Sequence, residues 1–132
     1  KLILNRDVSS EIILNVMSFG YKNGIPLDAD YMFDVRFLDN PYYKTELRSQ
    51  TGLDDAVSDY VFSQPEAVET VDSISNLMKH WIPLHSLTGK TSLTITIGCT
   101  GGQHRSVAIT ERLSKILSRK FNAVSTIHRD IR

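Results

Sequence analysis

The segment from Leu93 to Leu113 holds the residue pattern best suited to chemistry. An apolar run ends at Gly98, and the turn CTGGQHR then leads into a stretch with helical spacing. A strand, a glycine-rich turn and a helix start expose several backbone N–H groups to one point, and the helix adds a partial positive charge there. The guanidinium of Arg105 can donate charge-assisted hydrogen bonds to the same point. The pattern predicts a phosphate site, and the alternative is an ordinary tight turn.

The same turn fits the spacing C-x-x-G-x-x-R-S, which begins at Cys99. This spacing resembles the signature loop of cysteine-dependent phosphatases, in which a thiolate attacks phosphorus while an arginine, here Arg105, holds the oxygens. A thiol at a helix N-terminus beside an arginine has a lowered pKa, which would activate it. However, Gly98 stands where those enzymes usually carry histidine, and the general acid would have to be Asp34 or Asp39. A phosphatase is therefore the alternative to a binding site.

A second group of polar residues follows the segment YMFDVRF. If residues 31–37 form a strand, Asp34 and Arg36 point to the same face near its carboxyl end. Together with Asn40 they offer an acid, a base and an amide, which suit the hydroxyl groups of a polyol. The alternative is a surface ion pair beside an Asn-Pro turn. Lys22, after the first predicted strand, would either contact an anion or be a solvated turn residue.

Hydrophobic periodicity and turn residues predict alternating strands and helices. Predicted strands cover residues 11–19, 31–37, 92–98 and 123–128. Predicted helices cover residues 53–64, 104–119 and a segment that starts at Pro65 and is kinked or ended by Pro83. We expect an α/β domain whose mostly parallel sheet carries helices on both faces. Ligands of such sheets lie at the carboxyl ends of the strands, where the glycine turn is found.

Composition narrows the class of protein. The chain has 132 residues, of which one is cysteine, and no apolar run approaches the ~20 residues that span a bilayer. We expect a single domain in a reducing compartment, the cytoplasm, without disulfides or membrane contact. His80 and His85 do not share a helix face, so neither a metal site nor a cofactor is predicted. Because the first residue is Lys1, we expect a piece of a longer protein.

The 15 basic and 15 acidic residues are unevenly distributed. Residues 28–72 contain eleven acidic and three basic residues, whereas residues 103–132 contain seven basic and two acidic ones. A basic C-terminal surface can track the phosphates of a nucleic acid, and the alternative is a role in solubility or self-association. The candidate RNA contacts are Arg112, Lys115, Arg119, Lys120 and Arg129.

Three motifs occur in order along the chain: SFGYKNGIPLDADYMFDVRFLDNPYY from Ser18, TGLD from Thr51, and TIGCTGGQHRSV from Thr96. Together they resemble the C-terminal domain of the RapZ family, bacterial RNase adapters also described as P-loop nucleotide-binding proteins. The resemblance covers residues 18–128. The P-loop domain that comes first in this family is absent from this chain, so nucleotide hydrolysis is not expected here.

The resemblance implies a sensory rather than an enzymatic role. Enterobacterial members bind a small regulatory RNA and present it to an endoribonuclease. This circuit controls glucosamine-6-phosphate synthase, and the C-terminal domain senses glucosamine 6-phosphate. The family domain is similar to a sugar-phosphate-binding part of phosphofructokinase and supports homo-oligomers. Residue by residue, the resemblance assigns the ligand pocket to Asp34, Thr100, Gly101, His104 and Arg105, with Cys99 and Gly102 shaping the loop. One departure is Tyr42, where enterobacterial relatives carry histidine.

Overall fold

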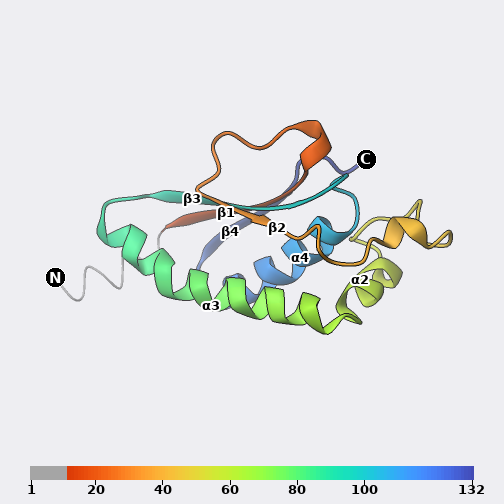
Figure 1. The fold of residues 1–132 in the computed structure, drawn as a ribbon. Coiled ribbons are helices and arrows are strands. Elements are labelled where there is room, and N and C mark those ends of the chain that lie inside the picture. Colours follow the sequence, from red (N-terminus) through yellow and green to blue (C-terminus); the bar gives the residue numbers. More distant parts are fainter. Residues whose placement is uncertain (1–11) are drawn as a thin grey trace.

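The computed structural model describes residues 12–132, which form four strands and three helices in the order β1, β2, α2, α3, β3, α4, β4 (Figure 1). The strands are β1 (Ile13–Gly20), β2 (Tyr31–Asp34), β3 (Ser92–Cys99) and β4 (Ala123–His128). The helices are α2 (Asp55–Phe62), α3 (Pro65–Leu87) and α4 (Arg105–Ser118). Short 3-10 turns follow the first two strands, at Tyr21–Asn23 and Pro41–Tyr43.

The strands form one sheet in the order β2-β3-β1-β4, and every pair is parallel. This confirms the α/β class and the parallel sheet expected from the sequence. The register places Gly20 of β1 beside Cys99 of β3, and Asp34 of β2 beside Gly98. The carboxyl ends of three strands therefore meet at one edge of the sheet.

All three helices cover one face of the sheet, and the connection between β1 and β2 crosses the other (Figure 1). The expectation of helices on both faces was therefore wrong. The strand order explains why, because the connections from β2 to β3 and from β3 to β4 advance across the sheet in the same direction. Right-handed crossovers then place their helices on the same side. The connection from β1 to β2 runs in the opposite direction and contains a 3-10 turn instead of a helix.

The core lies between the sheet and the helices. Alternate residues of the central strands, such as Leu14, Val16, Ile95 and Ile97, are buried there. They belong to one apolar cluster with residues of the helices, including Val71, Met78 and Ile82 of α3 and Ile109, Leu113 and Leu117 of α4. This cluster fixes α4 against β3, and with it the turn that joins them.

Two elements differ from the sequence prediction. Strand β2 ends at Asp34 rather than at residue 37. The last hydrogen bond between β2 and β3 runs from the amide of Val35 to the carbonyl of Gly98. Residues 35–38 then form a turn, in which the amide of Leu38 donates to the carbonyl of Val35. Helix α3 passes through Pro83 and ends at Leu87. Ile82 before the proline and Ser86 after it are buried, so packing outweighs the missing hydrogen bond. Glu11, in the first predicted strand, lies outside the described residues. None of the helices in residues 12–132 is both long and apolar enough to cross a membrane.

Candidate anion-binding site

A cavity of about 430 Å³ opens at the edge of the sheet where the carboxyl ends of the strands meet. Its walls come from the turn between β3 and α4, the 3-10 turns after β1 and β2, and the end of the chain. The lining residues are Lys22, Asn40, Tyr42, Tyr43, Cys99, Thr100, Gly101, Gln103, His104, Arg105 and Arg132. Three of them carry a positive charge and none is a carboxylate. The cavity therefore offers an electropositive environment.

Two glycines allow the end of β1 to touch the turn after β3. Gly102 has a φ of 76°, and a Cβ atom there would lie 2.7 Å from the amide nitrogen of Gly20. A Cβ atom on Gly20 would lie 2.4 Å from the carbonyl carbon of Gly101. Only glycine fits both positions. The contact also brings the amide of Lys22 within 3.2 Å of the carbonyl oxygen of Thr100, which places this lysine at the cavity.

Arg105, the first residue of α4, is buried with 4% of its surface exposed. Its Nη1 donates hydrogen bonds to the carbonyl oxygens of Arg36 and Leu38, both at 2.9 Å, and its Nη2 lies 3.4 Å from the hydroxyl of Thr100. Its Nε has no partner, and no ion pair joins it to a carboxylate in residues 12–132. Burying a cation without a counter-ion is costly, so this guanidinium favours an anion in the cavity.

His104 lies next to Arg105 but cannot supply a second charge. Burial lowers the pKa of its imidazole, which lies beside backbone groups of Leu47, Arg48 and Gln50. At neutral pH the ring is therefore uncharged, and its Nε2 is buried without a partner among the described residues. The loop above it is the TGLD motif: the amide of Gly52 donates to the carbonyl of Gln103, at 2.8 Å, and a Cβ atom on Gly52 would meet the carbonyl oxygen of His104.

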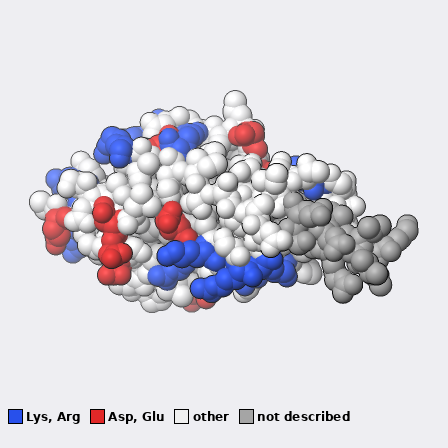
Figure 2. Space-filling view, turned by 180° about the vertical axis from the view of Figure 1, so that it is seen from behind, with Lys and Arg blue, Asp and Glu red and all other residues white. Residues whose placement is uncertain are grey.

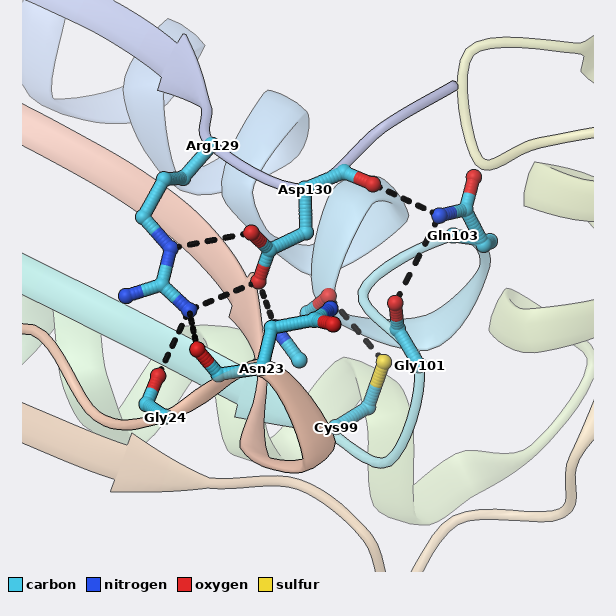
Figure 3. A network of polar contacts seen from close by, with 9 residues as sticks. Asn23, Gly24, Cys99, Gly101, Gln103, Arg129 and Asp130 are labelled. Atoms are coloured by element: carbon cyan, nitrogen blue, oxygen red, sulfur yellow. Dashed lines mark hydrogen bonds and ion pairs between the residues drawn. The ribbon is translucent and has the colours of Figure 1, made fainter.

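Cys99 is buried at the end of β3, and its thiol donates a hydrogen bond to the hydroxyl of Ser106 at 3.1 Å (Figure 3). The preceding Gly98 packs against the ring of Phe19, where a Cβ atom would lie 2.4 Å from a ring carbon. No histidine fits there, which accounts for the departure from the phosphatase pattern. The acids expected to serve a phosphatase, at positions 34 and 39, do not line the cavity.

The residues that follow β4 are hydrogen-bonded to the loops around the cavity (Figure 3). The carboxylate of Asp130 accepts a hydrogen bond from the amide of Gly20 at 2.7 Å, and the side chain of Gln103 donates to the carbonyl oxygen of Asp130 at 2.7 Å. Arg132 follows and lines the cavity. The sequence predictions had not assigned Gln103, Tyr43 or Arg132 to the site. Only Gln103, inside the glycine turn, carried a signal that would have identified it.

The whole described part of the chain, residues 12–132, matches the family model of the RapZ C-terminal domain. The chain belongs to this family. It is 46% identical over 129 residues to a nucleotide-binding protein of Shewanella woodyi, 49% over 116 residues to one of Pseudomonas fluorescens, and 54% over 117 residues to one of Pediococcus pentosaceus. These alignments cover 98%, 88% and 89% of this chain but 46%, 41% and 39% of the relatives. The chain thus spans less than half the length of the relatives it matches.

The RapZ-type motif around Asp34 places its charged residues outside the cavity lining. The guanidinium of Arg36 donates to both carboxylate oxygens of Asp34, from Nε at 2.9 Å and from Nη2 at 2.6 Å, and it also lies 3.9 Å from the centre of the Tyr21 ring. The hydrogen bond from Arg36 lowers the pKa of the Asp34 carboxyl. Asn40 does line the cavity, and its side chain accepts a bond from the amide of Tyr42. Ligand contact by Asp34 and Arg36 stays a prediction.

Four of the five predicted RNA contacts lie together on the surface of this RapZ-type domain. Arg112, Lys115, Arg119 and Lys120 are exposed along α4 and the turn after it, and Figure 2 shows a band of basic side chains on the face of the molecule opposite to the view in Figure 1. Arg129 is elsewhere, directly after β4, where it is paired with Asp130 at 2.8 Å. The cavity lies at the first residue of α4, and the basic residues extend from the middle of this helix to the turn after it, about 10–20 Å along the helix.

A serine, a histidine and a glutamate form a further polar chain in this domain. The hydroxyl of Ser18 lies 2.7 Å from Nδ1 of His128, whose Nε2 lies 2.7 Å from the carboxylate of Glu111. The arrangement has the composition of a hydrolase triad, but Ser18 is 0% exposed inside the sheet. A buried hydroxyl cannot reach a substrate. The role of these three hydrogen-bonded side chains is therefore to connect β1, β4 and α4. Residues 12–132 contain no group of three His, Cys, Asp or Glu side chains that could hold a metal ion.

Proposed function

We propose that this domain is the ligand-sensing part of a RapZ-type RNase adapter and binds a phosphorylated amino sugar, such as glucosamine 6-phosphate, in the cavity. The observation that carries the proposal is the buried guanidinium of Arg105, which has no carboxylate partner among the described residues and faces a cavity lined by three cations and no acid. Membership of the RapZ family supports the choice of ligand. Through such sensing, the domain would regulate amino-sugar metabolism.

The cavity has parts that suit both ends of a phosphosugar. The phosphate would lie against the turn from Thr100 to Arg105, where the guanidinium and the turn's amides can donate to its oxygens. The sugar would lie toward Asn40 and Tyr42, whose polar atoms can bond hydroxyl groups, with Asp34 beyond them as the family resemblance implies. A volume of about 430 Å³ is within the usual range of small-molecule sites.

We also propose that the basic face of α4 contacts the phosphates of a small regulatory RNA, which the adapter would present to an endoribonuclease. The exposed residues Arg112, Lys115, Arg119 and Lys120 support this role. Because they lie between the middle of α4 and the turn after it, and none of them lines the cavity, a phosphosugar and an RNA would occupy separate surfaces of the domain. Such a domain would act as a homo-oligomer in the longer protein.

A cysteine-dependent phosphatase is the second candidate, since Cys99 and Arg105 both line the cavity. The absence of a carboxylate from the cavity lining among residues 12–132 favours binding over catalysis, because a leaving alkoxide needs a proton donor. Cys99→Ser separates the two candidates. The substitution would abolish phosphate release by a phosphatase, whereas a sensor would keep its affinity for glucosamine 6-phosphate within about twofold, a change of under half a kcal/mol.

The proposal is tested by titrating glucosamine 6-phosphate into the chain and its Arg105→Met variant by calorimetry. Methionine fills the space of the arginine stem without its charge, so we expect affinity to fall at least about tenfold, the equivalent of one charge-assisted hydrogen bond. Lys79→Met on α3 removes a cation away from the cavity and serves as the control. Circular dichroism verifies that both variants fold. A folded Arg105→Met variant that binds as tightly as the parent would overturn the proposal.

A further inference from the structure

The chain-end segment, residues Arg129–Arg132, is bonded to both loops that form the anion cavity (Figure 3). On one side, Asp130 accepts a hydrogen bond from the amide of Gly20, at the end of β1. On the other side, Gln103 donates to the carbonyl of Asp130 at 2.7 Å and accepts from the amide of Arg132 at 3.2 Å. Four residues at the end of the chain thus connect two loops that are about 80 residues apart in sequence.

Arg129 extends this connection to the turn that carries Lys22. Its backbone amide donates to the carbonyl of Ser18 at 3.0 Å, and its guanidinium donates to the carbonyl of Gly24 at 2.6 Å. The same guanidinium is paired with the carboxylate of Asp130. Lys22 therefore lies on a short turn whose two ends are both held by the chain-end segment.

The chain-end segment also packs closely against the glycine turn. A Cβ atom on Gly102 would lie 3.1 Å from the Cβ of Asp130 on one side and 2.7 Å from the amide nitrogen of Gly20 on the other. The turn is thus enclosed between the chain-end segment and β1. The side chains of Gln103 and Asp130 are largely buried, so water screens their contacts little.

The three cations of the cavity are held in different ways. Arg105 is fixed by two backbone carbonyls of the segment after β2. Lys22 and Arg132 are exposed, and each lies on a segment that depends on the bonds made by Asp130 and Gln103. Loss of those bonds would leave Arg105 in place and release the other two positive charges from the cavity.

We propose that the chain-end segment is a positioning element for the anion site, in which Asp130 and Gln103 hold Lys22 and Arg132 against a bound phosphate. This inference rests on the proposed function of the cavity and names how that site is regulated. Because coupling between two equilibria is reciprocal, a phosphate that is held better when the segment is docked also stabilises the docked segment. Ligand binding in the cavity thereby increases the fraction of molecules in which the segment after β4 is docked.

The first test measures affinity for inorganic phosphate and for glucosamine 6-phosphate in a graded series of variants. Asp130→Asn keeps an acceptor for the Gly20 amide but loses the ion pair with Arg129, and Asp130→Ala loses both. We expect affinity to fall by about threefold for the first and about tenfold for the second, less than the lost hydrogen bonds themselves are worth, because Asp130 acts on the ligand only through the position of the cations. Asp72→Asn, an exposed position on α3, should bind as the parent does.

The second test follows amide hydrogen exchange, which a purely structural role of the segment would leave unaffected by ligand. Saturating phosphate should slow exchange at the amides of Gly20 and Arg132 at least about threefold in the parent chain, since both are bonded only when the segment is docked. The amide of Gly89, bonded to the carbonyl of Ser86 at the far end of α3, should not respond. In Asp130→Ala the response at Gly20 should disappear.

The outcomes separate this inference from the proposed function. If the parent chain binds phosphate but neither the affinity of the Asp130 variants nor the exchange at Gly20 changes, the positioning role is overturned and the proposed function stands. If the parent chain binds neither probe, both are overturned. Weaker binding by the folded Asp130 variants, together with ligand-dependent protection of Gly20, supports the positioning role.

Discussion

Nη1 of Arg105 lies 2.9 Å from the carbonyl oxygen of Leu38, 67 residues earlier in the chain. This bond joins the first residue of α4 to the segment that follows β2, and it fixes the guanidinium at the cavity. A backbone carbonyl satisfies an N–H group but does not neutralise a positive charge. The charge of this buried arginine therefore remains available to an anion, which is why we propose a phosphate ligand for the cavity.

Gly102→Ala should lower both stability and phosphosugar affinity, whereas Gly89→Ala should lower stability alone. Both glycines have a positive φ, 76° and 90°, which costs an alanine about 1–2 kcal/mol. A Cβ atom on Gly89 would meet nothing within 4 Å, but one on Gly102 would press on the backbone of Gly20. Urea unfolding and calorimetric titration of the two variants measure the difference. Equal stability losses and equal ligand affinities would show that the close contact at Gly102 has no role.

The stability of the domain should fall as the pH is lowered through the titration of His104. Burial lowers the pKa of this imidazole in the folded state below its ordinary value of about 6.5. Between the two values the unfolded chain binds a proton that the folded chain does not, so the free energy of unfolding increases with pH across that window. Above about pH 6.5 the contribution is constant.

Urea unfolding at several pH values between 5 and 7.5 measures this slope, roughly the range in which histidine titrates. His104→Gln should have a smaller slope than the parent chain, and Asn76→Gln, which changes an exposed residue of α3 that does not titrate, should keep the parent slope. A His104→Gln variant with the full pH dependence would assign the proton uptake to other groups.

Pro83→Ala should stabilise the domain. Helix α3 continues through Pro83 to Leu87, so the proline removes one backbone hydrogen bond without ending the helix. The variant regains that bond and has the higher helix propensity of alanine, so its free energy of unfolding should increase by about 1–2 kcal/mol. This gain is smaller than the full proline penalty of roughly 3 kcal/mol, because the substitution also increases the conformational freedom of the unfolded chain. Thermal and urea unfolding provide the measurement. A lower melting temperature in the variant would mean that the proline ring makes a packing contribution larger than the bond it removes.

RNA affinity should depend on the basic residues of α4 and on salt. Replacing Lys115 and Arg119 by glutamine should weaken binding of an RNA hairpin, and the slope of log affinity against log salt should become shallower by about 0.7–0.9 for each RNA phosphate that these two side chains neutralise. Filter binding at several salt concentrations gives both values. The control is Lys90→Gln, which replaces a lysine that is paired with Asp30 near the amino end of β3. An unchanged slope in the double variant would exclude α4 as the RNA surface.

The sequence predicted the glycine turn well because its signal is local. Residues 92–105 contain an apolar strand, two adjacent glycines and the helix start, and each follows from neighbouring residues. The structure places Cys99, Thr100, Gly101, His104 and Arg105 on the cavity wall as one unit. The parallel sheet was also predictable, since its apolar strands alternate with helical segments.

Contacts between distant segments were harder to predict. Arg132 lies at the end of the chain, and only the pairing of β4 with β1 brings it to the cavity. The face of the sheet on which the helices lie depends on strand order, which hydrophobic periodicity does not encode. The family resemblance assigned His104 to the ligand pocket, but its burial under residues 47–50 became visible only with the fold.

The central claim is that the cavity binds a phosphosugar without hydrolysing it. The most direct measurement is phosphorus NMR of glucosamine 6-phosphate titrated with the chain and followed over several hours. We predict that the phosphate resonance shifts or broadens as protein is added, and that no inorganic phosphate signal develops. Growth of an inorganic phosphate signal, lost in Cys99→Ser, would contradict the sensor and make the domain an enzyme. A resonance that never changes would contradict binding itself.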